Sequence, residues 1–447
     1  MKNLSVKHII TLLKPYVKSA TFFNIATVAV ITILVKGFGF FKEVVVLGTF
    51  GLSELLDTFY IAALVPGFIN EVFLISFKSV FVPNYVAEIK TNKHFASFQS
   101  TSFLVTVAMG LVFIGIAFLV TDTFLSTFFS GHTASYYSLV KTQFYYLAPC
   151  ILLWGLISLL GGLLHIDNEF TFSSLHPALT SVAMLICLFF FKEQLQEKVL
   201  AVGMLIGCIS EFIFLLIVSL KRKIIALGIP DFSSVNARLM FKEFPARVSS
   251  SFLTGLIPVT DQFFAAQLII GSVAALNYGL KVPALISTLF IIALGNVLLP
   301  YFSKLIIDNK EEAFRKLFQI LKTLFVVLVF ICAILLVFSE FIIDLIFERN
   351  AFTSEDTLVV SRIQQMFLIG IPFTICGNII VGFLTSMNKN KFMAYISLIT
   401  VILNVLLDFI LMKKIGIIGI ALCTAFLQLF RSVVFLLYTL KQKRLTL

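Results

Sequence analysis

The sequence predicts an all-α polytopic membrane protein, in which about 12 transmembrane helices form two six-helix, pseudo-symmetric lobes around a central cavity. Three observations predict this fold class: an apolar composition, repeated apolar runs of spanning length, and an internal duplication. Of the 447 residues, 59% are hydrophobic and 13% are charged, whereas soluble domains have about 45–50% and about 25%. A soluble, disordered or fibrous chain is therefore excluded. The pI near 9.3 does not indicate DNA binding, because the basic residues lie between apolar runs and form no polar face.

Each membrane helix is predicted from a run of roughly 20 mainly apolar residues that ends at charged residues or at Gly, Pro or Asn. The first, second and eighth runs also contain charges and glycines. Because the basic arm before the first run is broken by Pro15 and no small-residue cleavage site follows, we expect a mature span there and no cleavable signal. The runs lie near residues 21–48, 55–82, 98–120, 138–164, 172–191, 199–220, 248–270, 274–300, 323–339, 363–386, 392–412 and 416–440.

The distribution of basic residues predicts the orientation, because Lys and Arg are retained on the cytoplasmic side of a membrane. Of the 34 Lys and Arg residues, 22 lie in the N-terminal arm, the C-terminal tail and the loops on that same side, and six lie in loops on the opposite side. An even number of spans also places both termini on one side. We therefore predict that both termini are cytoplasmic.

Two pairs of prolines indicate an internal duplication. Pro66 and Pro83 lie 17 residues apart in the second run, and Pro283 and Pro300 lie 17 residues apart in the eighth, at an offset of 217. A second match relates the fourth run to the tenth. Two six-span copies in the same orientation are a transporter architecture, with the substrate path between the halves. We predict an N-lobe over residues 1–220, a basic cytoplasmic connector that acts as a hinge over 221–247, and a C-lobe over 248–447.

Basic residues inside the spans form the candidate substrate site. A charge at the bilayer centre costs at least about 2.5–3.5 kcal/mol, so such groups usually face a bundle interior or a wet cavity. Lys36, Lys42 and Lys78 lie in the first two runs, and Lys281 lies at the equivalent level of the eighth. Together they predict a cationic patch between the halves that binds an anion such as a phosphate.

Three acidic residues, Glu43, Asp57 and Glu71, are predicted gates or charge partners. A spacing of seven residues puts Glu43 on the same helix face as Lys36, and Glu71 on the same face as Lys78. These lysines can therefore bind the substrate, pair with the carboxylates, or do both, and Lys78 can also snorkel to the cytoplasmic face. Asp57 lies near the outer end of the second run, where it is either a gate or a salt-bridge partner.

Four further charged residues have other predicted roles. Asp408 and Glu211 lie inside spans and are either helix-packing or ion-coupling groups. Lys141 and Arg431 are expected to be interfacial anchors near span ends. The six cysteines all lie inside apolar runs and are expected to be core residues.

The sequence contains no recognisable catalytic motif. It has no phosphate-binding loop, no dinucleotide fingerprint and no His-Glu-x-x-His, and its Ser and His residues have no triad spacing. We therefore expect a secondary-type transporter with no enzyme activity, no cofactor and no metal site. Without an ATP site, transport is expected to use a coupling ion, the membrane potential or the substrate gradient.

Several motifs resemble the MurJ (MviN) family of lipid II flippases, within the multidrug/oligosaccharidyl-lipid/polysaccharide exporter superfamily. The segment Lys36–Glu43 is similar to the family's Arg-x-x-Gly-Phe-x-Arg-Asp/Glu, and Asp57–Tyr60 is similar to its Thr-Asp-Ala-Phe-Phe. Tyr278–Lys281 is similar to the family's Tyr-Ala-Asp-Arg, and Leu345–Thr353 is similar to its Leu-Phe-Glu-Arg-Gly-Ala-Phe-Thr loop. The similarity extends over essentially the whole chain.

The resemblance implies a flippase of the bacterial cytoplasmic (inner) membrane that serves peptidoglycan synthesis, cell wall biogenesis and cell shape. Its substrate would be an undecaprenyl-pyrophosphate-linked saccharide, lipid II, moved to the outer leaflet by alternating access. Lys36, Lys42 and Lys281 stand where the family has cavity arginines, so charge is kept while bidentate phosphate contact is lost. Asn70 and Glu71 replace an arginine pair, and the chain is expected to lack the last two of the family's fourteen spans.

Three alternative functions remain at this point. The first is export of another polyprenyl-linked glycan, such as an O-antigen or exopolysaccharide unit, which the missing spans favour and the Arg349 loop disfavours. The second is a drug or cation antiporter, although the cavity charges lean basic. The third is a membrane scaffold or a membrane glycosyltransferase, which Asp122, Glu355 and Asp356 do not support. The expected partners are the lipid-linked saccharide and the bilayer, with no nucleic acid, and the chain is expected to be a monomer.

Overall fold

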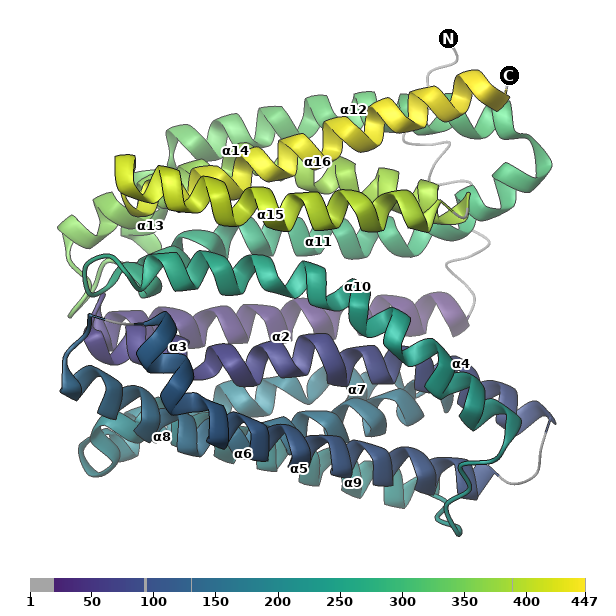
Figure 1. Cartoon of the computed structure of the whole chain (residues 1–447), viewed down its shortest axis with the longest axis horizontal. Coiled ribbons are helices and arrows are strands. Elements are labelled where there is room, and N and C mark those ends of the chain that lie inside the picture. Colours follow the sequence, from purple (N-terminus) through teal and green to yellow (C-terminus); the bar gives the residue numbers. More distant parts are fainter. Residues whose placement is uncertain (1–19, 92–94, 130, 388, 447) are drawn as a thin grey trace. The chain divides into compact units, whose positions relative to one another are not determined.

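The computed structural model describes residues 20–91, 95–129, 131–387 and 389–446, and this part of the chain is almost entirely helical (Figure 1). Its only extended pairing is an isolated bridge between Arg349 and Phe352. The first half contains α2 (Ala20–Phe50), α3 (Glu54–Ile69), the π-helix η1 (Asn70–Leu74), α4 (Ile75–Thr91), α5 (Phe95–Phe128), α6 (Ala134–Ile166), α7 (Phe170–Leu175), α8 (Pro177–Leu195), the 3₁₀-helix η2 (Gln196–Lys198) and α9 (Val199–Lys221). The second half contains α10 (Val235–Ala265), α11 (Ser272–Asp308), α12 (Lys310–Val337), α13 (Ser339–Phe347), α14 (Ser354–Ser386), α15 (Asn390–Ile415) and α16 (Ile417–Thr446).

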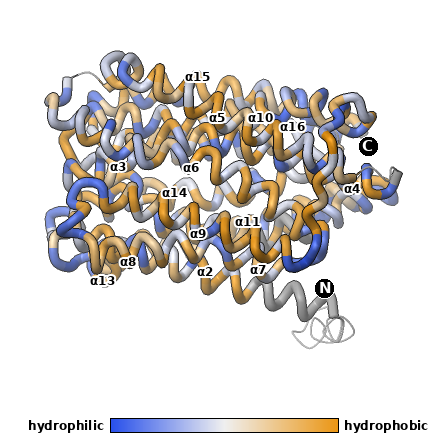
Figure 2. The backbone as a smooth tube through the Cα atoms, turned by 90° about the horizontal axis from the view of Figure 1, so that it is seen from below, coloured by the Kyte–Doolittle hydropathy of each residue, from blue (hydrophilic) through white to orange (hydrophobic). Residues whose placement is uncertain are grey.

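These helices confirm the predicted fold class. In the described residues, nine helical stretches are long and apolar enough to cross a membrane. One of them, the 52-residue stretch Phe170–Lys221, contains both α8 and α9, and α2 and α10 add two helices of 31 residues each. The described helices therefore account for about 12 crossings. Figure 2 shows that hydrophobic residues dominate the helices and that hydrophilic residues gather in the connections between them.

The chain divides into two compact units. The first comprises the described residues of Met1–Val46, Val65–Thr121 and Val140–Val248, and the second comprises Leu47–Leu64, Asp122–Leu139 and Ser249–Leu447. Segments from the ends of α2, α3, α5 and α6 thus pack with the C-terminal half of the sequence. The predicted lobes 1–220 and 248–447 are the two halves of the internal duplication, and their boundaries stay a prediction.

Aromatic stacking and close glycine contacts hold the first unit together. The rings of Phe81, Tyr85 and Phe98 stack with centroids 5.4 to 6.0 Å apart, within the range for favourable ring pairs. Where α9 crosses α8, a Cβ at Gly207 would lie 2.5 Å from the Thr180 Cα atom. In a membrane, small residues of this kind let helix backbones approach closely, which replaces the missing hydrophobic driving force.

The second unit uses the same device between α14 and α16. A Cβ at Gly370 would lie 3.1 Å from the Ala425 Cα atom, and a Cβ at Gly377 would lie 2.4 Å from the Ser432 hydroxyl. The core between α11, α12, α14 and α16 includes the buried rings of Phe302, Phe314, Phe383 and Phe435, and Figure 1 shows α12, α14 and α16 running alongside one another.

The duplicated proline pairs have different local structures. Pro66 and Pro83 lie in α3 and α4, which the π-helix Asn70–Leu74 separates. Pro283 and Pro300 both lie inside the continuous helix α11. A π-helix inserts one extra residue into a helical turn. In the first copy, the side chains that follow the π-helix at residue 70 are therefore turned about the helix axis relative to those before it. The second copy has no such offset.

Candidate functional site

The predicted substrate lysines of α2 lie in the first unit. Lys36 is exposed and Lys42 is half-buried. The Lys42 ammonium lies 2.6 Å from the carboxylate of Glu43, its neighbour in the sequence. Glu43 is therefore a charge partner of Lys42, where the helical spacing had suggested Lys36. A carboxylate partner of this kind lowers the cost of a lysine inside an apolar helix.

Lys78 and Glu71 do not form the ion pair that a regular helix predicts. Among the described residues neither has an ionic partner, and Glu71 is exposed within the π-helix while Lys78 is half-buried. The Lys78 ammonium instead faces α6, where a Cβ at Gly161 would lie 3.8 Å from it. The extra residue of the π-helix rotates the two positions relative to each other, which explains why a spacing of seven fails here.

Asp57 caps helix α11 of the other half of the sequence. Its carboxylate oxygens accept hydrogen bonds from the backbone N–H groups of Gly271 at 2.6 Å and Ala274 at 2.7 Å. These are free donors of the α11 N-terminus, and the helix dipole favours an anion there. Asp57 is only 2% exposed. The predicted gating residue therefore joins the two halves through charge-assisted hydrogen bonds to backbone, and the salt-bridge alternative is not needed.

Two glycines of the first half fit against the loop that follows α13. The Gly48 carbonyl accepts a hydrogen bond from the Ala351 N–H at 3.0 Å. Gly51 has a φ of +59°, and a Cβ there would lie 2.4 Å from the Ala351 carbonyl oxygen. Only glycine tolerates both conditions. We refer to the contacts of residues 48–57 with residues 271–274 and 349–351 as the gate contacts, all of which lie within the second unit.

The motif Leu345–Thr353 builds the other side of the gate contacts. The Arg349 guanidinium donates to the Ile346 carbonyl at 2.5 Å, and so satisfies a free acceptor at the end of α13. Glu348 accepts a hydrogen bond from the Thr357 hydroxyl at 2.7 Å. Thr353 and Asp356 then form a capping box that starts α14. These polar residues shape a rigid turn, so Arg349 is a structural residue of the gate contacts.

Lys281 lies in the second unit beside aromatic rings. Its ammonium is 5.5 Å from the centroid of the Tyr278 ring and 6.0 Å from that of Tyr60. Tyr60 and Tyr278 themselves meet edge to face at 6.2 Å. Two ring faces stabilise a cation in a partly desolvated place, and Lys281 remains half-buried. Since Lys36, Lys42 and Lys78 belong to the first unit, the cationic patch that unites all four stays a prediction.

A buried polar cluster joins α10, α15 and α16 in the second unit. Asn404 donates to Asp261 at 2.9 Å and to Asp408 at 3.0 Å, and the Thr424 hydroxyl donates to Asp261 at 2.9 Å. The side chains of Asn404 and Asp408 are fully buried. One oxygen of each, Asn404 Oδ1 and Asp408 Oδ1, has no hydrogen-bond partner among the described residues. Two carboxylates and two spare oxygens in an apolar interior form an oxygen-rich place for a cation.

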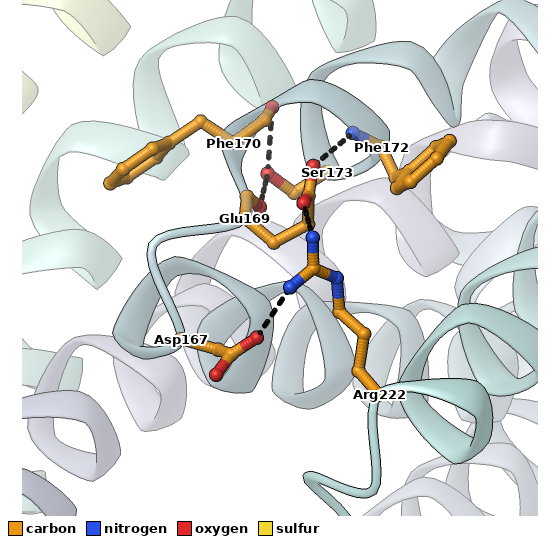
Figure 3. Close-up of polar contacts among 6 residues, drawn as sticks. All are labelled: Asp167, Glu169, Phe170, Phe172, Ser173 and Arg222. Carbon is orange, nitrogen blue, oxygen red and sulfur yellow. Dashed lines mark hydrogen bonds and ion pairs between the residues drawn. The ribbon is translucent and has the colours of Figure 1, made fainter. Parts of the chain in front are cut away.

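The basic connector predicted as a hinge is attached to the first unit. The Arg222 guanidinium reaches between Asp167 and Glu169, donating to Asp167 at 3.0 Å and also to Glu169 (Figure 3). Glu169 in turn caps α7 by accepting from the Phe172 N–H. The Ser233 hydroxyl and backbone N–H both donate to Asp231 and lower the pKa of that carboxyl.

Three consecutive side chains of α5 hold the connector along its length. Gln99 accepts from the Ala226 N–H at 2.9 Å and donates to the Ile224 carbonyl at 2.9 Å. Ser100 and Thr101 accept from backbone N–H groups further along, at 2.8 Å each. All three side chains are buried. The residues between α9 and α10 are therefore fixed on α5, and α10 itself carries the chain from the first unit into the second at residues 248 and 249.

Several of these residues are absent from the sequence prediction. Asn404 and Thr424 carry no charge, and nothing in their local sequence distinguishes them from other polar residues in helices. Gln99 also lies in an ordinary polar stretch. Arg431 was expected at an interface, but it lies 14 residues into the 30-residue α16, about 21 Å from the helix start at 1.5 Å per residue. This position is far from both ends of the helix, and the anchor interpretation stays a prediction.

The comparisons with known protein families and sequences point in one direction. The family model described as lipid II flippase MurJ matches residues 46–447. A Helicobacter pylori protein named "probable lipid II flippase MurJ" is 26% identical over 405 residues, which cover 85% of this chain and 86% of that protein. A Rickettsia prowazekii protein of the same name is 22% identical, over 93% of this chain and 83% of that protein.

Solved structures share the fold. A lipid II flippase MurJ in an inward closed conformation superposes with a TM-score of 0.79 at 24% identity, over 93% of this chain and 87% of that one. An inward-facing multidrug resistance MATE family transporter of the MOP superfamily superposes with a TM-score of 0.74 at 12% identity, over 94% and 98%. At these identities the structural matches establish the fold alone.

Proposed function

This chain belongs to the lipid II flippase MurJ family, and on that premise we propose that it moves lipid II across the bacterial cytoplasmic (inner) membrane by alternating access. Its cargo is a polyprenyl-pyrophosphate-linked saccharide, which passes from the cytoplasmic to the outer leaflet. The protein is a multi-pass membrane transporter, and both termini lie in the cytoplasm. It acts as a monomer and catalyses no covalent step.

The observation that carries the proposal is the presence of lysines in membrane helices of both halves. Lys36 and Lys42 lie on α2, Lys78 on α4 and Lys281 on α11. Lysine is a compact, strongly hydrated point charge that suits a phosphate. Its ammonium does not form the bidentate contacts that arginine forms. Several lysines therefore bind a cargo through their combined charge, and they release it more easily than arginines would.

The gate contacts support alternating access. Asp57 accepts two backbone hydrogen bonds from the start of α11, and Gly48 accepts one from Ala351. These few bonds join short segments of the two halves at the end that the charge distribution predicts to be outer. A small set of polar contacts can break and re-form during each cycle, because their net contribution is a few kcal/mol.

The buried cluster of α10, α15 and α16 supports a coupling cation. We place a monovalent cation, a proton or a sodium ion, between Asp261 and Asp408, where Asn404 Oδ1 and Asp408 Oδ1 have no other partner. Two ionised carboxylates this close in an apolar interior repel each other unless a cation or a proton neutralises one of them. Binding there biases the second unit toward one conformation, provided that the two states differ in affinity.

The test of the flippase is rescue of cells depleted of their own lipid II flippase, read out as lipid II accessible in the outer leaflet. We expect rescue by the unaltered chain, loss with Lys281→Ala, and partial retention with Lys281→Arg. Lys413→Ala is the matched control, because Lys413 also lies over an aromatic ring, at 3.9 Å from Phe409, and is no part of the site. Membrane levels are measured for every variant.

The outcomes separate the alternatives. Failure of the unaltered chain at normal membrane levels would contradict lipid II as cargo and favour another polyprenyl-linked glycan, such as an O-antigen unit. Rescue that survives Lys281→Ala would contradict the site while leaving the function intact. For the coupling cation, sodium or a lower pH should raise the melting temperature of the purified chain, and Asp408→Asn should abolish this response.

A further inference from the structure

Arg431 is a half-buried cation that has no counter-charge among the described residues. It lies near the middle of α16, and its Nε atom is buried with no hydrogen-bond partner among the described residues. No carboxylate of the described chain lies within ion-pair distance of it. Its guanidinium carbon lies 5.9 Å from the centroid of the Phe435 ring. An intramembrane arginine that no protein anion neutralises is a functional candidate.

The Arg431 side chain borders a small polar pocket between α14 and α16. The pocket has a volume of about 100 Å³ and is lined by Thr374, Gly377, Asn378, Gln428, Arg431, Ser432 and Phe435. Gly377 makes it possible, because a side chain there would collide with Ser432. All these residues belong to the second unit.

The lining offers hydrogen-bond donors and no competing negative charge. Asn378 uses one amide hydrogen on the Thr374 carbonyl, at 2.9 Å, and keeps the second. Gln428 has no hydrogen bond to the described chain, so its amide group is available. The Thr374 and Ser432 hydroxyls already donate to backbone carbonyls. A guanidinium and two amide groups around a small pocket therefore match an anion, since a cation without a partner in a partly apolar place is costly.

An apolar cavity adjoins the polar pocket through Asn378, which lines both. This second cavity, of about 430 Å³, lies between α11 and α14 and includes Phe290, Leu298 and Phe302. Its volume and apolar lining suit a hydrocarbon chain, and the shared residue Asn378 places it next to the pocket at Arg431. The anion can thus be free in solution or be the headgroup of a lipid.

We propose that the pocket at Arg431 is an anion site, which binds a single phosphate-type group or a halide against the guanidinium and the amides of Asn378 and Gln428. The proposal goes beyond the flippase function and does not depend on it. Since the site lies inside the second unit, its occupancy stabilises the packing of α14 on α16 by neutralising the arginine.

The test measures the melting temperature of the full purified chain, at constant sodium concentration and pH. In detergent, phosphate or chloride replaces gluconate, which is too large for the pocket. In a separate arm free of small anions, nanodiscs of phosphatidylcholine are compared with nanodiscs that also contain phosphatidylglycerol. The variants are Arg431→Gln, Arg431→Lys and Gln428→Leu. Lys443→Gln is the matched control, because Lys443 on the same helix also lies over a ring, at 5.7 Å from Phe318, but is not part of the lining of the pocket at Arg431.

We expect a saturable rise in melting temperature that Arg431→Gln abolishes and Lys443→Gln retains. Gln428→Leu should weaken apparent affinity about tenfold, because it removes one hydrogen bond to a charged ligand. A response to phosphate or chloride identifies a free anion, and a response only to phosphatidylglycerol identifies a lipid headgroup. If Arg431→Gln does not fold, the Gln428→Leu titration decides. Equal responses of the unaltered chain and Gln428→Leu, or no anion response at all, would overturn the proposal.

Discussion

The hydrogen bonds that Asp57 accepts from the start of α11 should determine how often the gate contacts open. Asp57→Asn removes the charge and leaves one acceptor oxygen, while Asp57→Ala removes both acceptors. A hydrogen bond to a charged group contributes about 1.5–3 kcal/mol, and loss of a helix cap costs about 0.5–2 kcal/mol. We therefore expect the closed gate to lose about 2 kcal/mol in Asp57→Asn and about 3 kcal/mol in Asp57→Ala. Those losses correspond to roughly 30-fold and roughly 150-fold more opening.

The assay is the rate at which a membrane-impermeant maleimide labels Ser272→Cys from the side that the distribution of basic residues predicts to be outer. Ser272 is 5% exposed at the start of α11, so labelling requires opening. All six native cysteines are buried, which keeps the background low. Glu54→Gln is the matched control, because Glu54 lies in the same first turn of α3 and does not cap α11. Labelling rates that remain within threefold of the parent in both Asp57 variants would refute the capping argument.

Three further outcomes follow from the contacts described. Gly51→Val should open the gate contacts, because its φ of +59° and the nearby carbonyl exclude a side chain. Ser272→Cys should then be labelled faster, whereas the control Gly115→Ala, where a Cβ meets no other atom, should leave the labelling rate unchanged. Gln99→Leu should release the connector, so that trypsin cleaves it about tenfold faster from the cytoplasmic side; an unchanged cleavage rate would show that Ser100 and Thr101 suffice. Arg222→Gln should lower the free energy of unfolding by no more than about 1 kcal/mol, because the Arg222 side chain is 40% exposed; a larger loss in denaturant unfolding would contradict this.

Local sequence was sufficient for the features that depend on a few neighbouring residues. The apolar runs predicted the helices, because a bilayer requires about 20 apolar residues per crossing. The importance of Asp57 was also visible, since a carboxylate inside an apolar run is costly unless a partner satisfies it. The motif Leu345–Thr353 was recognisable by its resemblance to a family motif, because its residues are contiguous in the chain; the capping box at its end is seen only in the structure.

Partners distant in the sequence were not predictable in the same way. The spacing of Glu71 and Lys78 assumed a regular helix, and a single π-turn changed the faces on which they lie. The basic connector was expected to act as a hinge, and its sequence did not show that buried side chains of α5, 125 to 130 positions away, form hydrogen bonds with its backbone. Such contacts depend on helix packing, which a one-dimensional pattern does not contain.

The sequence by itself determined that this chain is a helical membrane protein of the MurJ family with lysines at membrane depth, because hydropathy and short motifs are local properties. Only the tertiary structure decided which groups lie next to the charged residues. It placed Asp57 at the N-terminus of α11, surrounded Asp261 with Asn404 and Thr424, and left Arg431 beside a polar pocket without a carboxylate. The physical reason is that the cost of a charge in an apolar interior depends on the groups within a few ångströms of it, and packing alone brings those groups together.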